Sequence, residues 1–207
     1  MDTLSEASPV RHAVLTAEGR SLLFTDARTA SFFAPTPVTD EELKEIWELA
    51  KWPPTQANTQ PLRVLFVRTA EGKERLVKHL AEGNRAKSSS APVTAVLALD
   101  TQFHEHVPQV FPHNPALKEI FEGNVDKRIQ DGTFSAALQA GYFIIAARAI
   151  GLYAGPMTGF DKAGVDAEFF PDGRFKSLAV VNLGHPAENA YKGRLPRLDV
   201  ATTVQWA

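Results

Sequence analysis

The sequence contains no cysteine among its 207 residues. This absence excludes disulfides, thiolate nucleophiles and thiolate metal ligands, so any redox chemistry has to belong to a bound cofactor. An excess of positive charge is also missing, because 22 basic and 24 acidic residues give a formal net charge of −2. Without a basic stripe that could follow a phosphate backbone, nucleic acid is not expected as a partner.

The N-terminus lacks a basic region followed by an apolar one, so it does not match a secretory signal, and a cytoplasmic protein is the default expectation. The longest apolar run, residues 134–155, approaches the length of a membrane span. Ser135, Gln139 and Arg148 interrupt it, and no flanking basic cluster marks an orientation. The run therefore predicts a central helix packed closely by its neighbours, with no membrane partner.

Regular patterns in the chain indicate a single domain of mixed helices and strands. Thr39 and Glu42 fit a capping box that begins a helix, and Pro53 and Pro54 end it. Neither a regular alternation of strands and helices nor a glycine-rich phosphate loop is present, so the predicted fold class is α+β. Further helices are expected at 71–84, 134–155 and up to 169–170, and buried strands at 62–68, 92–100 and 177–184.

Three segments stand apart from these patterns. Residues 1–9 are expected to be flexible, and residues 186–207 to form an extended, proline-marked arm. Residues 101–132 have weak periodicity and are the least regular part of the chain. His104, His106 and His113 lie in it and could bind zinc if a strand presented them. Because prolines interrupt the segment and no second ligand cluster accompanies it, no metal site is predicted.

The polar stretch PPTQANTQP, residues 53–61, connects a helix to a strand. Thr55, Asn58 and Gln60 offer hydroxyl and amide groups that could bind a planar polar ring, and the prolines would hold them in place. In an ordinary connection, the same side chains would only satisfy the backbone. Taken alone, the stretch favours the ordinary connection.

Five short motifs together resemble the FMN-dependent nitroreductase family, and they occur in that family's order. They are DARTASFF, PTQANTQP, EGNRAKSSSAP, GPMTGFD and KGRLP, and they span residues 26 to 197. Within the family, the style of the sequence is most similar to the malonic semialdehyde reductase type. The resemblance implies one nitroreductase-like domain over residues 1–207, with a central, mostly antiparallel sheet flanked by helices. It also implies a homodimer with a swapped C-terminal tail and a mobile flap formed by residues 101–132.

The activity that the resemblance implies is NAD(P)H-dependent flavin chemistry. NADH or NADPH would pass a hydride to N5 of FMN, and a small electron-poor substrate would then accept it in a ping-pong reaction. A small aldehyde such as malonic semialdehyde is the expected substrate, with broad reduction of nitroaromatics or quinones as the alternative. A nonredox flavin-binding module is the competing class. No side chain need be an essential acid or base, because the cofactor carries the chemistry.

The resemblance also assigns residues to the cofactor. Lys192 and Arg194 match the tail motif that binds the FMN phosphate, for which Arg offers bidentate contacts and Lys a point charge. Asn84 and Lys87 match residues near the pyrimidine end of the ring, where a cation stabilises the charge of the reduced flavin. The other matches are Arg28, Thr29 and Ser31 in the N-terminal box, Thr55, Asn58 and Gln60 from the partner subunit, and Ser135, Pro156, Met157, Thr158 and Gly159 around the ring.

Two positions depart from the family pattern. Ser31 stands where a basic residue is frequent, so more of the charge stabilisation would fall to Lys87. Thr158 stands where an acidic residue frequently precedes Gly-Phe-Asp, so the surface under the flavin ring would carry less negative charge. Arg63, next to the loop, is a candidate partner for a substrate carboxylate.

Overall fold

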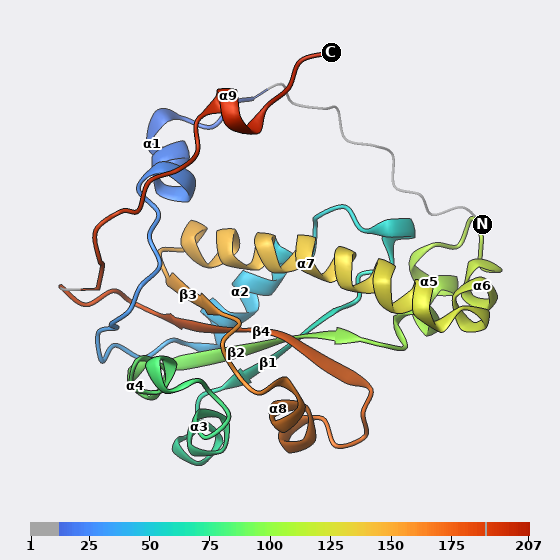
Figure 1. Cartoon of the computed structure of the whole chain (residues 1–207), viewed down its shortest axis with the longest axis horizontal. Coiled ribbons are helices and arrows are strands. Elements are labelled where there is room, and N and C mark those ends of the chain that lie inside the picture. Colours follow the sequence, from blue (N-terminus) through green and yellow to red (C-terminus); the bar gives the residue numbers. More distant parts are fainter. Residues whose placement is uncertain (1–12, 189) are drawn as a thin grey trace.

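The computed structural model describes residues 13–188 and 190–207, so most of the segment expected to be flexible lies outside it. A four-stranded antiparallel sheet forms the centre of the molecule, with helices on both faces (Figure 1). The strands are β1 Leu62–Val67, β2 Val93–Asp100, β3 Tyr153–Met157 and β4 Phe175–Gly184, in the spatial order β1-β2-β4-β3. The predicted α+β class is confirmed.

The helices connect and cover these strands. They are α1 Ala17–Arg20, the π-helical η1 Ser21–Thr25, α2 Asp40–Ala50, the short 3-10 turn η2 Gln56–Asn58, α3 Ala70–Val77, α4 Glu82–Ser90, the 3-10 turn η3 Phe103–His106, α5 Val107–Val110, α6 Leu117–Gly123, α7 Val125–Ala149, α8 Lys162–Phe169 and α9 Val200–Thr203. The segment expected to act as a flap therefore contains η3, α5, α6 and the first turns of α7.

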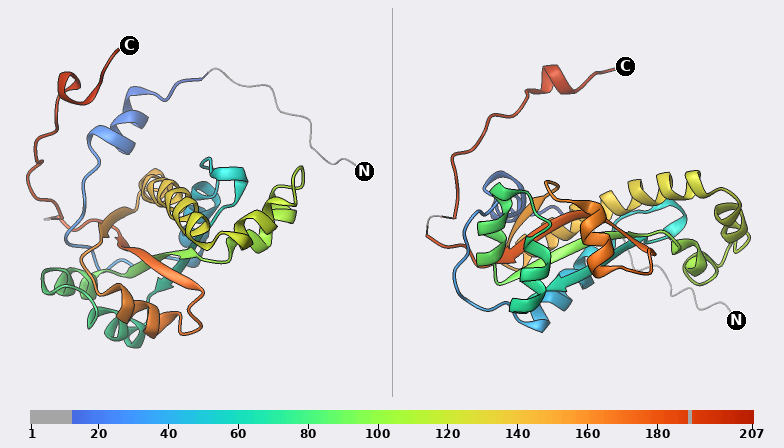
Figure 2. Two further views of the ribbon diagram at one scale, coloured as in Figure 1. Left: turned by 45° about the vertical axis from the view of Figure 1, so that its right-hand side comes forward. Right: turned by 60° about the horizontal axis from the view of Figure 1, so that its bottom comes forward.

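Both faces of the sheet are buried. Ala95, Leu97 and Leu99 of β2 face one core, which α2 and α7 cover, while Val96 faces a second core under α3 and α8. This alternation follows from the two-residue period of a strand. Figure 2 shows the same layering from two further directions.

The predicted capping box of α2 is present. Thr39 Oγ1 accepts a hydrogen bond from the Glu42 backbone N at 3.2 Å, and Glu42 Oε2 accepts one from the Thr39 backbone N at 2.7 Å. Such a cap contributes about 1 kcal/mol to helix stability. Val38 and Leu43, which flank it, are both buried. The start of α2 is thus fixed by local sequence.

Two predicted elements differ in the structure. The single helix expected at 71–84 is divided into α3 and α4, because Leu80 bridges Phe160 and the Ala81 backbone N donates to the Gly159 carbonyl at 3.0 Å. The GPMTGFD stretch, expected as a loop, begins as strand β3. Pro156 is tolerated there because β3 is an edge strand, where proline need not donate to a ladder.

Two apolar surfaces remain exposed. The central helix runs over Val125–Ala149 rather than 134–155, and Phe134, Leu138 and Tyr142 lie exposed on it at a spacing of four residues. The arm from residue 190 runs away from the sheet (Figures 1 and 2) and exposes Leu195 and Trp206 among other apolar side chains. The central helix is therefore packed on one side only in a single chain.

Trp52 is 74% exposed. It follows the C-cap of α2, where the chain has already left the core-facing side of that helix. None of the helices in residues 13–188 and 190–207 has the length and apolar character needed to cross a membrane.

Candidate functional site

The N-terminal box and the C-terminal tail lie side by side, although they are far apart in the sequence. The Ser31 backbone N donates to the Ala190 carbonyl at 2.9 Å, and the Ala34 backbone N donates to the His185 carbonyl at 2.8 Å. Arg28 Nη1 donates to the carbonyl of Lys192, 164 positions later, at 3.0 Å. These contacts place two predicted cofactor-binding segments against each other.

A pocket of about 330 Å³ opens between these segments. Arg194 lies in its wall, and its Nη2 donates to the Ala27 carbonyl at 3.2 Å and also to the Thr25 carbonyl. The arginines at the pocket, Arg28, Arg148, Arg194 and Arg197, donate to backbone carbonyls, and none of the pocket's cations forms an ion pair within the described part of the chain. The lining residues are Ala27, Arg28, Thr29, Ser31, Arg148, Lys192, Gly193, Arg194, Leu195 and Arg197. An uncompensated group of guanidinium and ammonium groups is suited to a dianion such as a phosphate monoester.

Arg148 is a pocket residue that the sequence motifs did not assign. It lies in the last turn of α7, and its Nη1 donates to the Leu23 carbonyl at 3.4 Å. Its Nε is buried without a hydrogen-bond partner, and burial lowers the pKa of the guanidinium. The sequence did contain a signal for Arg148, because it is a lone arginine within an apolar helix. A buried cation needs an anionic or polar partner, which indicates a ligand or a polar contact at that position.

The second group of predicted residues borders β3. Asn84 Nδ2 donates to the Gly159 carbonyl at 2.9 Å, and Lys87 follows on the same face of α4 because residues three apart in a helix are neighbours. Met157 is buried, whereas Thr158 and Gly159 are exposed after the strand ends. Asn84 therefore contacts the GPMTGFD segment, Lys87 lies about one helical turn from Asn84, and their expected place near the flavin stays a prediction.

The N-terminal box and strand β3, which the second group borders, approach each other closely at Gly155. A Cβ built on Gly155 would lie 2.9 Å from the Ala30 carbonyl oxygen, so only glycine permits the N-terminal box to approach β3 this closely. The structure thus gathers the predicted residues Arg28, Thr29, Ser31, Asn84, Lys87, Pro156, Met157, Thr158, Gly159, Lys192 and Arg194 around one end of the sheet.

The PPTQANTQP loop, residues 53–61, lies apart from these groups, and its polar groups are hydrogen-bonded within the protein. We refer to this loop as the loop wall. Ser135 Oγ accepts from the Gln56 backbone N at 3.2 Å, and Thr55 Oγ1 accepts from the Gln60 backbone N at 3.2 Å. Gln60 Nε2 donates to Asn58 Oδ1 at 3.1 Å, and Asn58 Nδ2 donates to the Val110 carbonyl at 2.8 Å. The amides expected to face a flavin are therefore oriented before any ligand is present.

The same loop has unusual backbone angles. Ala57, Asn58 and Gln60 have positive φ values of 48°, 53° and 46°. Non-glycine residues adopt this left-handed region at a cost, and clusters of them occur where structure is imposed by surrounding contacts. The prolines end α2, and the left-handed residues then turn the chain into β1.

The loop and the cationic pocket do not meet within one chain. Ser135 beside the loop and Arg148 at the pocket are thirteen positions apart on α7, which corresponds to about 20 Å along a helix. Figure 1 shows the turn that precedes β1 and the arm at different ends of α7. Ser135, expected near Pro156 to Gly159, is placed with the loop instead.

Two other expectations concern charged or basic side chains. Arg63 Nη2 lies 2.8 Å from Asp100 Oδ2, so the guanidinium already has a carboxylate partner, and its expected pairing with a substrate carboxylate stays a prediction. His104 is buried with its Nε2 3.2 Å from Arg128 Nη1, and burial and that guanidinium lower the pKa of His104. No group of three His, Asp or Glu side chains suited to a metal occurs among the residues described.

The chain is similar to known proteins in sequence and in fold. The sequence pattern of the Nitroreductase family matches residues 25–185, and the chain belongs to that family. A Streptomyces coelicolor protein with the provisional name NADH dehydrogenase/NAD(P)H nitroreductase is 60% identical over 191 residues, which cover 92% of this chain and 95% of that protein.

Solved structures show the same fold at low sequence identity. A nitroreductase-like protein from Exiguobacterium sibiricum, solved in complex with FMN, superposes with a TM-score of 0.82 at 16% identity, over 94% of this chain and 99% of that one. One from Bacillus subtilis gives 0.81 at 21% identity, over 93% of this chain and 100% of the other. The predicted nitroreductase-like fold is confirmed.

Proposed function

We propose that the protein is an FMN-dependent NAD(P)H oxidoreductase that reduces a small electron-poor substrate. One observation carries this proposal: the N-terminal box, the end of α7 and the C-terminal tail converge on a pocket lined by several cations that lack carboxylate partners within the described residues. The residues fit the cofactor, because the buried and unpartnered Arg148 Nε is a donor that a phosphate oxygen would satisfy. FMN also accompanies the fold in the Exiguobacterium relative.

The chain's own residues would bind and tune the cofactor. Arg28, Lys192 and Arg194 would hold the phosphate, and Lys87 would place a positive charge at the pyrimidine edge of the ring. A charge fixed there lowers the energy of an anionic reduced ring without reorganisation. Bound FMN supplies the chemistry by accepting a hydride from NADH or NADPH and donating it to the substrate.

We infer that the complete site is formed by two copies of the chain, with Thr55, Asn58 and Gln60 contributed by the partner subunit. The separation of about 20 Å between the two parts of the site along α7 supports this arrangement. The exposed stripe of Phe134, Leu138 and Tyr142 and the projecting apolar arm offer a surface that a second copy would cover. The part of each arm that follows the pocket residues would be swapped onto the other subunit, while Lys192 and Arg194 stay in the pocket of their own chain.

The first experiment tests the activity. Purified protein should be yellow, and its absorbance should bleach anaerobically with NADPH or NADH and recover when an oxidant is added. A flavin that binds without bleaching would favour a nonredox flavin-binding module. The reduced enzyme should then be offered malonic semialdehyde, a nitroaromatic and a quinone, because fast reoxidation by the aldehyde alone would support the malonic semialdehyde reductase type.

A second experiment tests the shared site by complementation. One subunit carries Arg28→Ala and Arg194→Ala, the other carries Asn58→Ala and Gln60→Ala, and each homodimer is expected to bind FMN poorly. Mixed dimers would contain one site with all four side chains intact and one site with none of them. Recovery of about half the FMN binding in mixed dimers supports the shared site, whereas no recovery contradicts it.

A further inference from the structure

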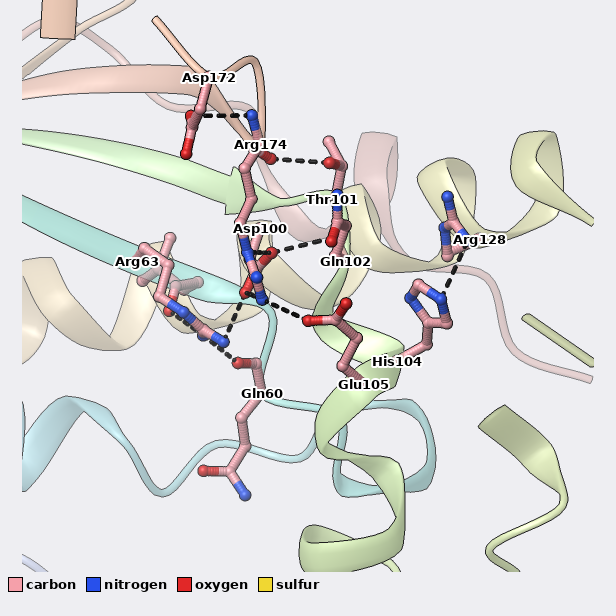
Figure 3. Close-up of polar contacts among 11 residues, drawn as sticks. Gln60, Arg63, Asp100, Thr101, Gln102, His104, Glu105, Arg128, Asp172 and Arg174 are labelled. Carbon is pink, nitrogen blue, oxygen red and sulfur yellow. Dashed lines mark hydrogen bonds and ion pairs between the residues drawn. The ribbon is translucent and has the colours of Figure 1, made fainter. Parts of the chain in front are cut away.

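A buried carboxylate lies beneath the loop wall. Asp100, the last residue of β2, is 1% exposed, and its Oδ1 accepts from the Gln102 backbone N at 3.0 Å. Arg63 Nη2 lies 2.8 Å from its Oδ2, and Arg174 Nε lies 2.9 Å from its Oδ1. A charge this deeply buried persists only when it is paired. We refer to Arg63, Asp100, Glu105 and Arg174 as the Asp100 cluster (Figure 3).

One side of the Asp100 cluster reaches the loop wall. Arg63 Nη1 donates to the Gln60 carbonyl and to the Leu62 carbonyl, each at 2.9 Å. In Figure 3 the carbonyl of Gln60 faces Arg63 while its side chain points away from the cluster. Arg63 therefore stabilises the left-handed backbone of Gln60, while the Gln60 side chain stays on the opposite side, where its Nε2 donates to Asn58 Oδ1 at 3.1 Å.

The other side of the Asp100 cluster reaches the segment after β2. Arg174 Nη2 lies 3.0 Å from Glu105 Oε2, and the Thr101 backbone N donates to the Arg174 carbonyl at 3.0 Å. Glu105 belongs to η3, where the segment expected to act as a flap begins. The cluster thus connects the loop wall with the start of that segment through a single buried carboxylate.

We propose that Arg63 is a positioning residue: held by Asp100, it fixes the backbone of Gln60 in the loop wall. Arg174 and Glu105 anchor the 103–123 segment to the same carboxylate. This inference rests on the proposed function, because it assigns the cluster to the flavin site. An arginine that served folding alone would change stability without changing flavin binding. A positioning arginine changes flavin binding through Gln60.

The test compares Arg63→Met with Arg68→Met. Arg68 follows the other end of β1 and pairs with Asp40 at an exposed position, so it provides a matched loss of one arginine and one ion pair. We expect Arg63→Met to raise the Kd for FMN and for riboflavin about tenfold, the effect of one well-placed hydrogen bond. Arg68→Met should leave both values unchanged. Equal Kd values for the two variants would overturn the inference.

A double-mutant cycle identifies the route of the effect. If Arg63 acts through Gln60, Arg63→Met should change the Kd far less in a Gln60→Ala background, because coupled residues are not additive. An undiminished effect in that background would overturn the inference. Should the Arg63→Met chain fail to fold, Arg63→Lys serves instead. Lysine keeps the charge beside Asp100 but lacks the fork that also reaches both carbonyls, so it should retain stability and still lose flavin affinity.

Glu105→Gln tests the second arm of the cluster. We expect the KM for the oxidising substrate to rise about threefold with kcat nearly unchanged, because only an exposed charge-assisted contact is lost, while the Kd for FMN stays the same. An unchanged KM would remove the 103–123 segment from the inference. A wild-type protein that binds no FMN would overturn the proposed function as well, whereas normal wild-type binding with inert variants would overturn the inference alone.

Discussion

The two parts of the candidate site are built in opposite ways. The cationic pocket between residues 27–31 and 192–197 is exposed, and its arginines are bonded to carbonyls rather than to carboxylates of the described chain. The loop wall at residues 53–61 is neutral; its side chains are bonded to one another and to the Val110 carbonyl, and its backbone is bonded to Ser135 of α7. The pocket has cations without anionic partners, whereas the polar groups of the loop wall already have hydrogen-bond partners.

This difference teaches where affinity and orientation come from. Uncompensated cations gain energy when an anion arrives, because charged hydrogen bonds are stronger than neutral ones. A preformed neutral wall gains less per contact but loses little entropy, since its side chains and strained backbone are already fixed. The pocket should therefore determine how tightly the phosphate is held, and the wall how the ring lies.

The largest expected effect is on the pocket. Arg194→Ala should weaken FMN binding about 30- to 100-fold, because it removes a charged hydrogen bond of about 2–3 kcal/mol. The riboflavin Kd should change little, since riboflavin has no phosphate. Fluorescence titration measures both values, and urea unfolding checks that the free energy of unfolding is nearly preserved. An equal loss of affinity for FMN and riboflavin would contradict the assignment of the phosphate to the pocket and of the ring to the loop wall.

Arg148→Met should weaken FMN binding about tenfold and leave the ligand-free protein at least as stable as the wild type. Its buried Nε lacks a partner and burial lowers its pKa, so replacing the cation with an apolar side chain removes an unfavourable burial. Thermal unfolding of the ligand-free form and FMN titration provide the two readouts. A strongly destabilised variant with normal FMN binding would show that Arg148 serves the fold.

Lys87→Ala should lower the reduction potential of the bound flavin by about 30 mV, which corresponds to about 1.4 kcal/mol for two electrons. FMN should be largely retained, because Lys87 lies on α4 away from the phosphate pocket. Spectroelectrochemical titration measures the potential, and Lys87→Arg is the charge-preserving control. An unchanged potential would sink the role assigned to Lys87.

The smallest effect concerns the strain of the wall. Gln60→Gly should raise the free energy of unfolding by about 0.5 kcal/mol, because relief of the left-handed strain slightly exceeds the entropy cost of glycine. FMN and riboflavin should both bind more weakly by a similar factor, because the amide is lost. Thr69→Gly, at a residue with φ of −76°, is the control and should destabilise the protein.

Local chemistry explains what the sequence could predict. The capping box at Thr39, the prolines after α2 and the all-buried strand β2 depend on neighbouring residues, and the structure contains all three. The division between α3 and α4 depends on Gly159 and Phe160, which lie 78 and 80 positions after their partners Ala81 and Leu80, and no local pattern reports this. Strand β3 was missed because its glycine and proline are normal for a loop and acceptable only at a sheet edge.

The candidate site follows the same rule. Motif resemblance supplied most of the candidate residues, including those of the N-terminal box and of the tail. It could not supply Arg148, whose importance appears only when the end of α7 reaches the pocket, nor the engagement of Arg63 by Asp100, which requires β1 and β2 to be adjacent. Contacts between distant segments decide which charged residues are free to bind a ligand.

The most direct test measures the ratio of the riboflavin Kd to the FMN Kd in the wild type, Arg194→Ala and Asn58→Ala. The wild-type ratio should be high, and Arg194→Ala should reduce it about 30-fold or more, because charged hydrogen bonds to the phosphate are lost. Asn58→Ala should weaken both ligands and leave the ratio unchanged. A ratio that falls in Asn58→Ala, or stays constant in Arg194→Ala, would contradict the division of the site into a phosphate pocket and a ring wall.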